Sequence, residues 1–372
     1  MNGLPSSTAP QCLLVADDLT GACDAAVHFA ASGARTIVAV SSAGVDRAAE
    51  VLAFSTGSRD VAPAESARLI AAAAARLCPL RPNLVFKKID STLRGNTGAE
   101  IVAALREFGC DAAVVNPAFP AQGRVVETGV LRVAGDAAFR PVEIAAWLRA
   151  NGAADCRHIR PGQISNAIAQ GARFLSLDAV CDGDLAGIAA EILATPRRIL
   201  WAGSGGLAAA LARCLPPPAP AAPDPLKQTG PVLYCLGSDH PVTLEQKSRL
   251  LQAREVRLLR AGTASAAEVR AALELGNHVA LRIPRGQVAM ENLRCLLSAC
   301  RPAPFFISGG DTAALVCQAL GVNAIEMSRE LAPGIPMGIL RGGVADNSTV
   351  VTKSGGFGSP HDLVRIGDYF RA

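Results

Sequence analysis

The chain has 372 residues, a formal net charge of +4, 50% hydrophobic residues and 18% charged residues. This length suits about two domains, since a single hydrophobic core seldom grows beyond roughly 250–300 residues. The small positive charge forms no dense basic block, and the two Trp and two Tyr offer few stacking surfaces, so nucleic acid is not expected as a partner.

The N-terminal segment has no basic stretch followed by an apolar one, and no run approaches the ~18 apolar residues of a membrane-spanning helix. We therefore expect a cytoplasmic protein with no membrane partner. Eleven cysteines without a C-x-x-C pair, and five histidines without a short ligand spacing, predict no metal site formed by the protein alone.

Short apolar runs alternate with alanine-rich helical stretches along the first part of the chain, at 12–16, 36–40, 51–55, 83–89, 112–116, 174–177 and 199–203. This alternation is typical of βαβ units in a parallel, doubly wound sheet. A proline-rich stretch at 216–227 interrupts it and predicts an extended linker. The pattern then restarts at 232–238, 256–261, 278–284, 304–310, 324–328, 337–340 and 349–356. We predict two α/β domains with mainly parallel sheets, 1–215 and 228–372.

Two adjacent acids, Asp17 and Asp18, follow the first apolar run, and Thr20 and Gly21 then open a helix. Ligands of open α/β sheets bind beyond the carboxyl ends of the strands, so this loop is a candidate site. One acid at such a place is explained as a helix N-cap. Two adjacent acids favour, in addition, a general base or a metal-linked carboxylate.

The stretch "KKIDSTLRGN", residues 87–96, follows another apolar run. Strand alternation sends Lys88 and Asp90 to one face and Lys87 to the other. A solvated strand end with a capping hydroxyl is one interpretation. Arg94, whose planar fork suits a carboxylate or phosphate, and Gly95, which permits close backbone approach, favour a binding loop for a small polyhydroxylated acid.

Glycine-rich loops follow two runs of the second part. Gly309 and Gly310 precede Asp311 and Thr312 at a helix start, which is typical of an anion cradle. The other loop has Lys353 as a point charge and backbone donors at Gly355, Gly356 and Gly358, and a third small-residue loop includes Ser238. Together they predict the phosphate site of a nucleotide.

A competing signal lies at Gly203, Gly205 and Ala208, which fit the G-x-G-x-x-A dinucleotide fingerprint. The acid expected about 20 residues further on would be Asp224, inside the proline-rich stretch where no strand holds it. Tight packing of a helix on the sheet is therefore favoured over NAD binding. Neither a Walker A motif nor the protein-kinase signature is present.

Five motifs, "ADDLTGACD", "KKIDSTLRGN", "NPAFPAQGR", "SGGDT" and "SGGFGSP", resemble in order and spacing those of the four-carbon acid sugar kinase family. The resemblance covers nearly the whole chain. It implies an acid-sugar-binding domain at 1–215, a nucleotide-binding domain at 228–372 and an active site in the cleft between them. It implies a sugar-acid site of Asp17, Arg59, Lys88, Asp90, Ser91, Thr92, Leu93, Arg94, Gly95 and Asn96. It implies a nucleotide site of Ser238, Gly309, Gly310, Asp311, Thr312, Lys353, Gly355, Gly356, Phe357 and Gly358.

The expected reaction is transfer of a phosphoryl group from ATP, with Mg²⁺, to the terminal hydroxyl of D-threonate. Asp17 by preference, and Asp90 next, would accept the proton. D-erythronate and 3-oxo-tetronate are alternative substrates, and an NAD-linked oxidoreductase or a non-catalytic sugar-acid sensor are alternative functions. The sequence departs from the family at Asp239 and His240, where a Ser- and Cys-rich run is usual. The expected partners are the sugar acid and ATP, and a homodimer is considered.

Overall fold

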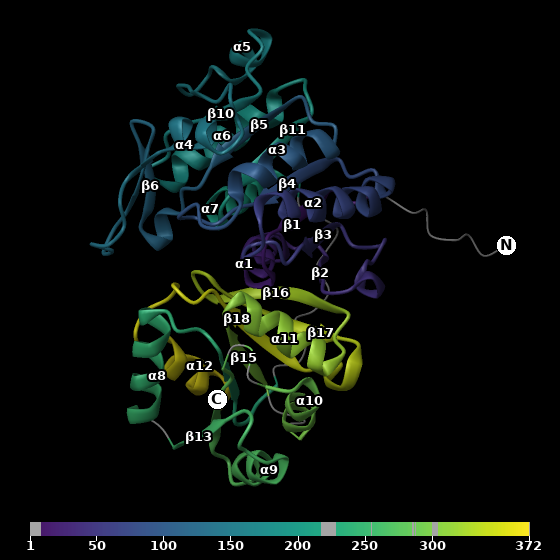
Figure 1. Cartoon of the computed structure of the whole chain (residues 1–372), viewed down its shortest axis with the longest axis vertical. Coiled ribbons are helices and arrows are strands. Elements are labelled where there is room, and N and C mark those ends of the chain that lie inside the picture. Colours follow the sequence, from purple (N-terminus) through teal and green to yellow (C-terminus); the bar gives the residue numbers. More distant parts are fainter. Residues whose placement is uncertain are drawn as a thin grey trace, which may run out of the picture. The chain divides into compact units, whose positions relative to one another are not determined.

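The computed structural model describes residues 9–216, 228–253, 255–284, 286, 288–299 and 304–371. All but the first residue of the predicted linker lies outside the described residues. Two compact units make up the chain (Figure 1). One unit comprises the described residues of 1–36 and 46–219, and the other those of 37–45 and 220–372.

The first unit contains a parallel sheet. In spatial order its strands are β3 (Val51–Ser55), β1 (Cys12–Ala16), β4 (Leu84–Lys88), β11 (Ile199–Gly203), β5 (Ala112–Asn116), β10 (Phe174–Ser176) and β9 (Arg157–His158). The central strand β1 is fully buried along its length, as expected of a parallel strand covered on both faces. A small antiparallel sheet of β6 (Arg124–Glu127), β7 (Val130–Val133) and β8 (Val142–Glu143) is added.

Helices cover both faces of this parallel sheet. Helix α1 packs against α7, which packs against α6, and α2 packs against α3. Their bounds are α1 (Leu19–Ala31), α2 (Pro63–Leu77), α3 (Thr97–Glu107), α4 (Ile144–Ala150), α5 (Ile164–Ala169), α6 (Asp182–Ala194) and α7 (Gly205–Cys214).

The glycines of the dinucleotide-like fingerprint serve helix packing. A Cβ on Gly203 would lie 2.6 Å from Leu207, and one on Gly205 would lie 2.7 Å from the ring of Phe119. Such distances are far below carbon contact distances, so only glycine lets α7 approach the strand ends this closely. The structure confirms the packing interpretation of this motif.

The second unit contains a mixed sheet. In spatial order its strands are β13 (Val256–Arg260), β14 (His278–Arg282), β12 (Leu233–Leu236), β15 (Phe305–Ser308), β18 (Thr349–Lys353), β17 (Ile335–Arg341), β16 (Ala324–Ala332) and β2 (Thr36–Ala39). Figure 1 shows α8 and α12 together beside this sheet, away from α9, α10 and α11. Their bounds are α8 (Pro241–Ala253), α9 (Ala266–Glu274), α10 (Met290–Ser298), α11 (Gly310–Leu320) and α12 (Asp362–Arg371). The hydrophobic core between α8, α12 and the sheet includes Tyr234, Phe306 and Phe370.

Strand β2 was predicted to belong to the parallel sheet of the first domain, but the structure pairs it differently. It pairs antiparallel with β16, through Ile37 with Glu326 and Ala39 with Ala324. Strand β17 is likewise antiparallel to both of its neighbours, β16 and β18. Short apolar runs look alike in either orientation, so the direction and partner of a strand depend on residues far away in the chain.

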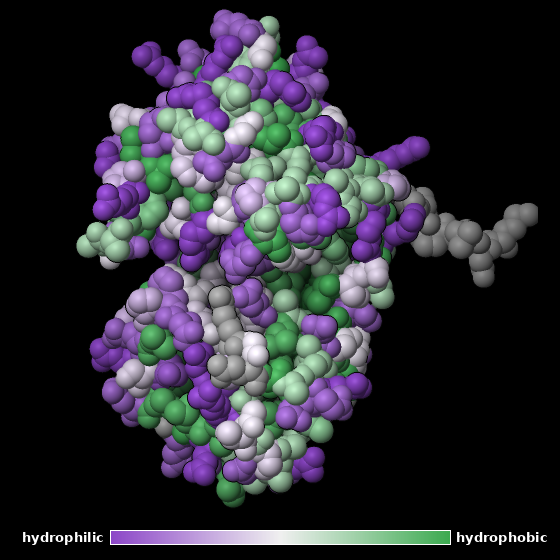
Figure 2. Space-filling view, viewed as in Figure 1, coloured by the Kyte–Doolittle hydropathy of each residue, from purple (hydrophilic) through white to green (hydrophobic). Residues whose placement is uncertain are grey.

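The apolar residues of the chain are used mainly in the two cores. Among the described residues, the exposed large hydrophobic side chains are Val180, Leu193, Leu244, Leu258, Leu275 and Met290. On the face drawn in Figure 2, hydrophilic and hydrophobic residues are interspersed. Within the described part of the chain, no helix combines the length and apolarity that crossing a bilayer requires.

Candidate functional site

Asp17 and Asp18, at the end of β1, share one arginine. Arg59 donates two hydrogen bonds to Asp17, from Nε to Oδ2 at 2.7 Å and from Nη2 to Oδ1 at 2.8 Å. Its Nη1 forms an ion pair with Asp18. Asp18 is also the N-cap of α1, because it accepts a hydrogen bond from the amide of Gly21. The capping explanation thus applies to Asp18, and Asp17 is directed at Arg59.

The electrostatics of the two acids differ. Burial alone would raise the pKa of Asp17, but the charges of Arg59, Lys87 and Lys88 outweigh it and lower the pKa. Burial, together with the negative charge of Asp17, raises the pKa of Asp18 above its ordinary value. One half-buried guanidinium therefore holds Asp17 ionised beside a more readily protonated neighbour.

Asp90 organises the loop that follows β4. It accepts the amide of Thr92 at 2.9 Å, and Arg94 binds it with two donors, Nη2 to Oδ2 at 2.7 Å and Nε to Oδ1 at 3.2 Å. Arg59 lies 3.9 Å from the same carboxylate. Although burial opposes ionisation, the two arginines and Thr92 hold the pKa of Asp90 well below its usual range.

The two lysines of β4 point to opposite faces of the sheet, as strand alternation predicts. Lys87 Nζ lies 2.8 Å from Glu100 Oε2 on α3, and both side chains are 1% exposed. Lys88 Nζ lies 3.4 Å from Asp24 Oδ2 on α1. Lys88 therefore lies on the same face of the sheet as Asp90 and α1, from which its ammonium could contact a ligand at the strand ends.

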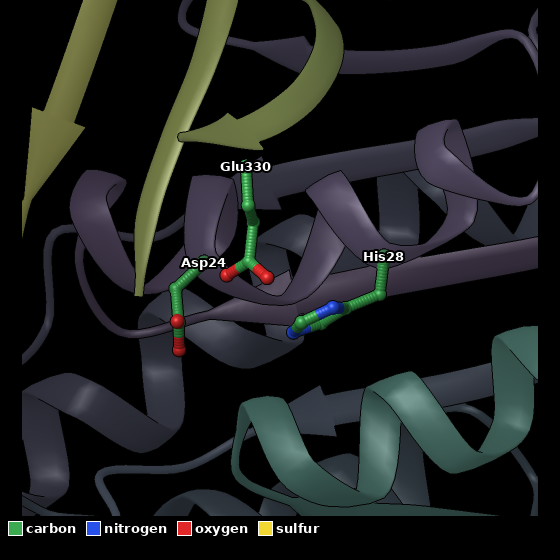
Figure 3. A group of neighbouring side chains, drawn as sticks. All are labelled: Asp24, His28 and Glu330. Carbon is green, nitrogen blue, oxygen red and sulfur yellow. The ribbon is translucent and has the colours of Figure 1, made fainter. Parts of the chain in front are cut away.

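Asp24 lies at the inner face of α1 next to Lys88. Neither of its buried carboxylate oxygens has a hydrogen-bond partner among the described residues, and burial raises its pKa. Figure 3 shows Asp24 and His28 projecting from α1, four residues apart; Glu330, also labelled, belongs to β16 of the second unit. Burial, with the charges of Arg213 and Lys88, lowers the pKa of His28 to about 4, so this imidazole is neutral at physiological pH.

Two close approaches fix the loop around Arg59. Gly95 has φ +76°, and a Cβ there would lie 3.2 Å from Cγ of Arg59 and 3.4 Å from Asp17 Oδ2. The side-chain Nδ2 of Asn96 donates to the carbonyls of Ser58 and Val61 at 3.0 and 2.8 Å, on either side of Arg59. Asn96 therefore holds the segment that presents Arg59. The other two predicted loop residues, Ser91 and Leu93, are buried.

Three loops of the second unit converge at the carboxyl ends of β12, β15 and β18. A Cβ on Gly237 would lie 2.0 Å from Thr312 Oγ1 at the start of α11, and one on Gly355 would lie 2.3 Å from Ser238 Oγ. Gly309, with φ +101°, forms the N-cap of α11, which starts at Gly310 and has Asp311 in its first turn. The structure thus brings together the predicted residues of all three loops.

Lys353 and the Asp239–His240 pair have defined neighbours in this second cluster. Lys353 is fully buried, and its ammonium lies beneath the loop of residues 354–358 instead of being exposed as a point charge. Asp239 forms an ion pair with Arg282. His240 accepts the amide of Val242 at 3.3 Å and packs beside Gly356.

Sequence reasoning missed several polar residues that complete these clusters. Glu100, in the first turn of α3, neutralises Lys87 and accepts a hydrogen bond from Ser58. Asp24 is part of a quoted motif, but only the helical periodicity of α1 could have placed it near Lys88. Thr243, on α8, donates to the carbonyl of Gly355 at 2.7 Å, and no local signal marks it.

Comparisons with known proteins agree with this two-part arrangement. A sugar-binding N-terminal domain model matches residues 12–145, and a nucleotide-binding C-terminal domain model matches residues 266–363. A D-threonate kinase of Bordetella bronchiseptica is 35% identical over 96% of this chain and 97% of its own length. A D-threonate kinase of Cupriavidus necator is 33% identical, over 93% and 95%. A D-erythronate kinase of Heliobacterium modesticaldum is 28% identical, over 96% of each chain.

Solved structures support the same fold. A protein from Salmonella typhimurium LT2 superposes with a TM-score of 0.76 at 21% identity, covering 98% of this chain and 100% of its own. A Haemophilus influenzae protein superposes with a TM-score of 0.71 at 19% identity, covering 96% and 99%. The chain is an α/β protein of the class that joins a sugar-binding domain to a nucleotide-binding domain. It belongs to the four-carbon acid sugar kinase family.

Proposed function

We propose that this protein is an ATP-dependent kinase that phosphorylates the terminal hydroxyl of a four-carbon sugar acid, with D-threonate as the first substrate. The D-threonate kinases among its relatives are 31% to 35% identical to it, and the D-erythronate and 3-oxo-tetronate kinases 25% to 28%. D-erythronate and 3-oxo-tetronate are the alternative substrates. A cytoplasmic location is part of the proposal, because ATP is available there.

The observation that carries the proposal is the cluster of Asp17, Arg59, Asp90 and Arg94 at the carboxyl ends of β1 and β4. Arg59 directs all three of its nitrogens at acids of the protein. Arg94 directs only Nε and Nη2 at Asp90, and its side chain is 54% exposed. Its Nη1 donates to no described residue, so Arg94 is the arginine with donors left for the carboxylate of a sugar acid.

The acids suit the hydroxyls of such a substrate. We propose that Asp17 orients the acceptor hydroxyl and takes its proton, with Asp90 as the alternative. A carboxylate whose pKa is lowered is a weak base, but phosphoryl transfer passes through a loose transition state in which positioning and charge neutralisation dominate. The ionised form of Asp17 is therefore well suited to orient the hydroxyl and accept its proton.

The loops of the second unit suit a nucleotide. Gly309, Gly310 and the loop 355–358 would receive the phosphates through backbone N–H groups. Mg²⁺, which neutralises the phosphate charge, would enter with ATP, and Asp311 is a carboxylate at this loop cluster that suits such a hard cation. Transfer requires the two substrates to meet, and that step is part of the proposal.

The test is to incubate the protein with ATP, Mg²⁺ and each of D-threonate, L-threonate, D-erythronate and a 3-oxo-tetronate, and to measure ADP. We expect the highest kcat/KM with D-threonate and a primary phosphate ester by phosphorus NMR. A higher kcat/KM with another tetronate would make that tetronate the preferred substrate in place of D-threonate. ADP release no greater than without any tetronate would contradict the kinase assignment.

A further inference from the structure

Lys353 lies at the end of β18, fully buried directly under the glycine-rich loop 354–358. Its Nζ donates to the carbonyl oxygens of Ser354 at 2.9 Å, Gly355 at 3.1 Å and Phe357 at 3.1 Å. A fourth contact, at 3.2 Å, is to the hydroxyl of Thr243. A single ammonium therefore binds the carbonyl oxygens of three residues within one short loop.

This arrangement determines where the amides of the loop point. In a trans peptide the C=O of one residue and the N–H of the next lie in one plane and point in opposite directions. Because the carbonyls of Ser354, Gly355 and Phe357 face the ammonium, the N–H groups of the following residues, 355, 356 and 358, face away from it. None of these three N–H groups donates to another described residue. Successive outward N–H groups form an anion-binding nest.

We propose that the Lys353 ammonium is a positioning group that holds loop 354–358 in its phosphate-binding form, so that loss of its proton weakens nucleotide binding. The inference rests on the proposed function, and it changes the role expected of Lys353 from direct phosphate contact to support from behind the loop. An ammonium has three N–H donors for these acceptors, whereas the neutral amine has two and a lone pair that repels the remaining carbonyl.

The surroundings of Lys353 place its titration near neutrality. Burial lowers its pKa to about 7, against the opposing effect of Asp362 at the start of α12. The side chains that hydrogen-bond to the ammonium, to its loop or to Thr243 are neutral: Thr243 and Gln246 on α8 and Ser308 on β15. The imidazole of His240, which lies beside Gly356, is a further titratable group at the loop. Asp362 is itself engaged with Ser359 and Arg365.

The experiment measures the affinity of the wild-type protein for ADP by calorimetry from pH 7 to pH 8.5. The last proton of the ADP phosphates has a pKa of about 6 or slightly above, and its loss over this range favours binding, so it cannot produce the weakening expected from Lys353. If only the protonated form binds and its pKa is about 7, Kd rises by up to about fifteen-fold over this range. Calorimetry at pH 8 in two buffers of different ionisation enthalpy should also show that one proton is taken up on binding. A flat affinity with no proton uptake would overturn the inference while leaving the proposed function intact.

A pair of variants separates support of the loop from a general loss of structure. Lys353→Met keeps the length of the side chain and removes the charge, so ADP should bind at least about ten-fold more weakly at pH 7, with little further change to pH 8.5. Lys247→Met, on α8, is the matched control and should keep wild-type affinity and pH dependence. Should Lys353→Met fail to fold, the wild-type pH series decides alone. Absence of ADP binding by the wild type at every pH would overturn the proposed function and this inference together.

Discussion

Replacing Arg94 with alanine tests the sugar-acid site most directly. The change removes two donors from Asp90, the contacts at 2.7 and 3.2 Å. The carboxylate keeps the backbone N–H and hydroxyl of Thr92, the backbone N–H of residue 94 and, at 3.9 Å, Arg59. Because the side chain of Arg94 is 54% exposed, solvent screens the pair, and the free energy of unfolding should fall by less than about 1 kcal/mol. The folded enzyme should therefore survive the substitution.

The effect on substrate binding should be much larger. A hydrogen bond between charged groups contributes about 1.5–3 kcal/mol, which corresponds to a rise in KM for the tetronate of roughly ten- to 150-fold. KM for ATP should change by less than about two-fold, because the proposed nucleotide loops belong to the second unit.

The assay is steady-state ADP formation with each substrate varied in turn. Arg106→Ala is the matched control, since this arginine of α3 is 73% exposed and pairs only with Glu107 at the surface. It should leave both KM values unchanged. Equal increases in the two KM values for Arg94→Ala would indicate that Arg94 contacts the phosphate of ATP. No increase in either KM would show that Arg94 does not bind a substrate.

Three further substitutions test the proposed base, the buried ion pair and the packing of α7. Asp17→Asn should lower kcat by ~10²–10⁴ while ADP affinity by calorimetry stays within about two-fold; an unchanged kcat would move the base to Asp90. Glu100→Gln leaves the buried Lys87 ammonium unpaired and should lower the free energy of unfolding in urea by about 3–5 kcal/mol. Glu65→Gln, on the surface of α2, is its control. Equal decreases in the free energy of unfolding for the two variants would show that burial of the Lys87–Glu100 pair does not matter. Gly205→Ala should cost about 1–3 kcal/mol through contact with Phe119, whereas Gly187→Ala on α6 meets nothing within 4 Å and should not destabilise.

Much of the fold was predictable, because its strands are short apolar runs between polar loops. Each predicted run coincides with a strand, and the α/β class is confirmed. The strands β6, β7, β8 and β9 were not predicted, since they have two to four residues, are partly or wholly exposed and carry no clear periodicity. The antiparallel pairing of β2 was missed because nothing near β2 in the sequence specifies β16 as its partner.

The site was predictable where local geometry dictates it and not where distant elements meet. Alternation along β4 correctly separates Lys87 from Lys88. The capping pattern fits Asp18, although the sequence does not say which of the two acids caps the helix. The position of Lys353 beneath its own loop, and the hydroxyl of Thr243 that meets it from α8, depend on tertiary packing. The chemical roles of these residues remain predictions.

The pairing of β2 with β16 has a consequence for how the chain is made. During synthesis Ala39 leaves the ribosome long before Ala324, its partner, because nearly the whole first unit is translated between them. At about 5–20 residues per second this interval is of the order of tens of seconds. An apolar strand with an unpaired edge would be available to other chains throughout that time. Nascent copies are therefore expected to expose this strand edge during synthesis, and separate expression of residues 228–372 would lack β2 altogether.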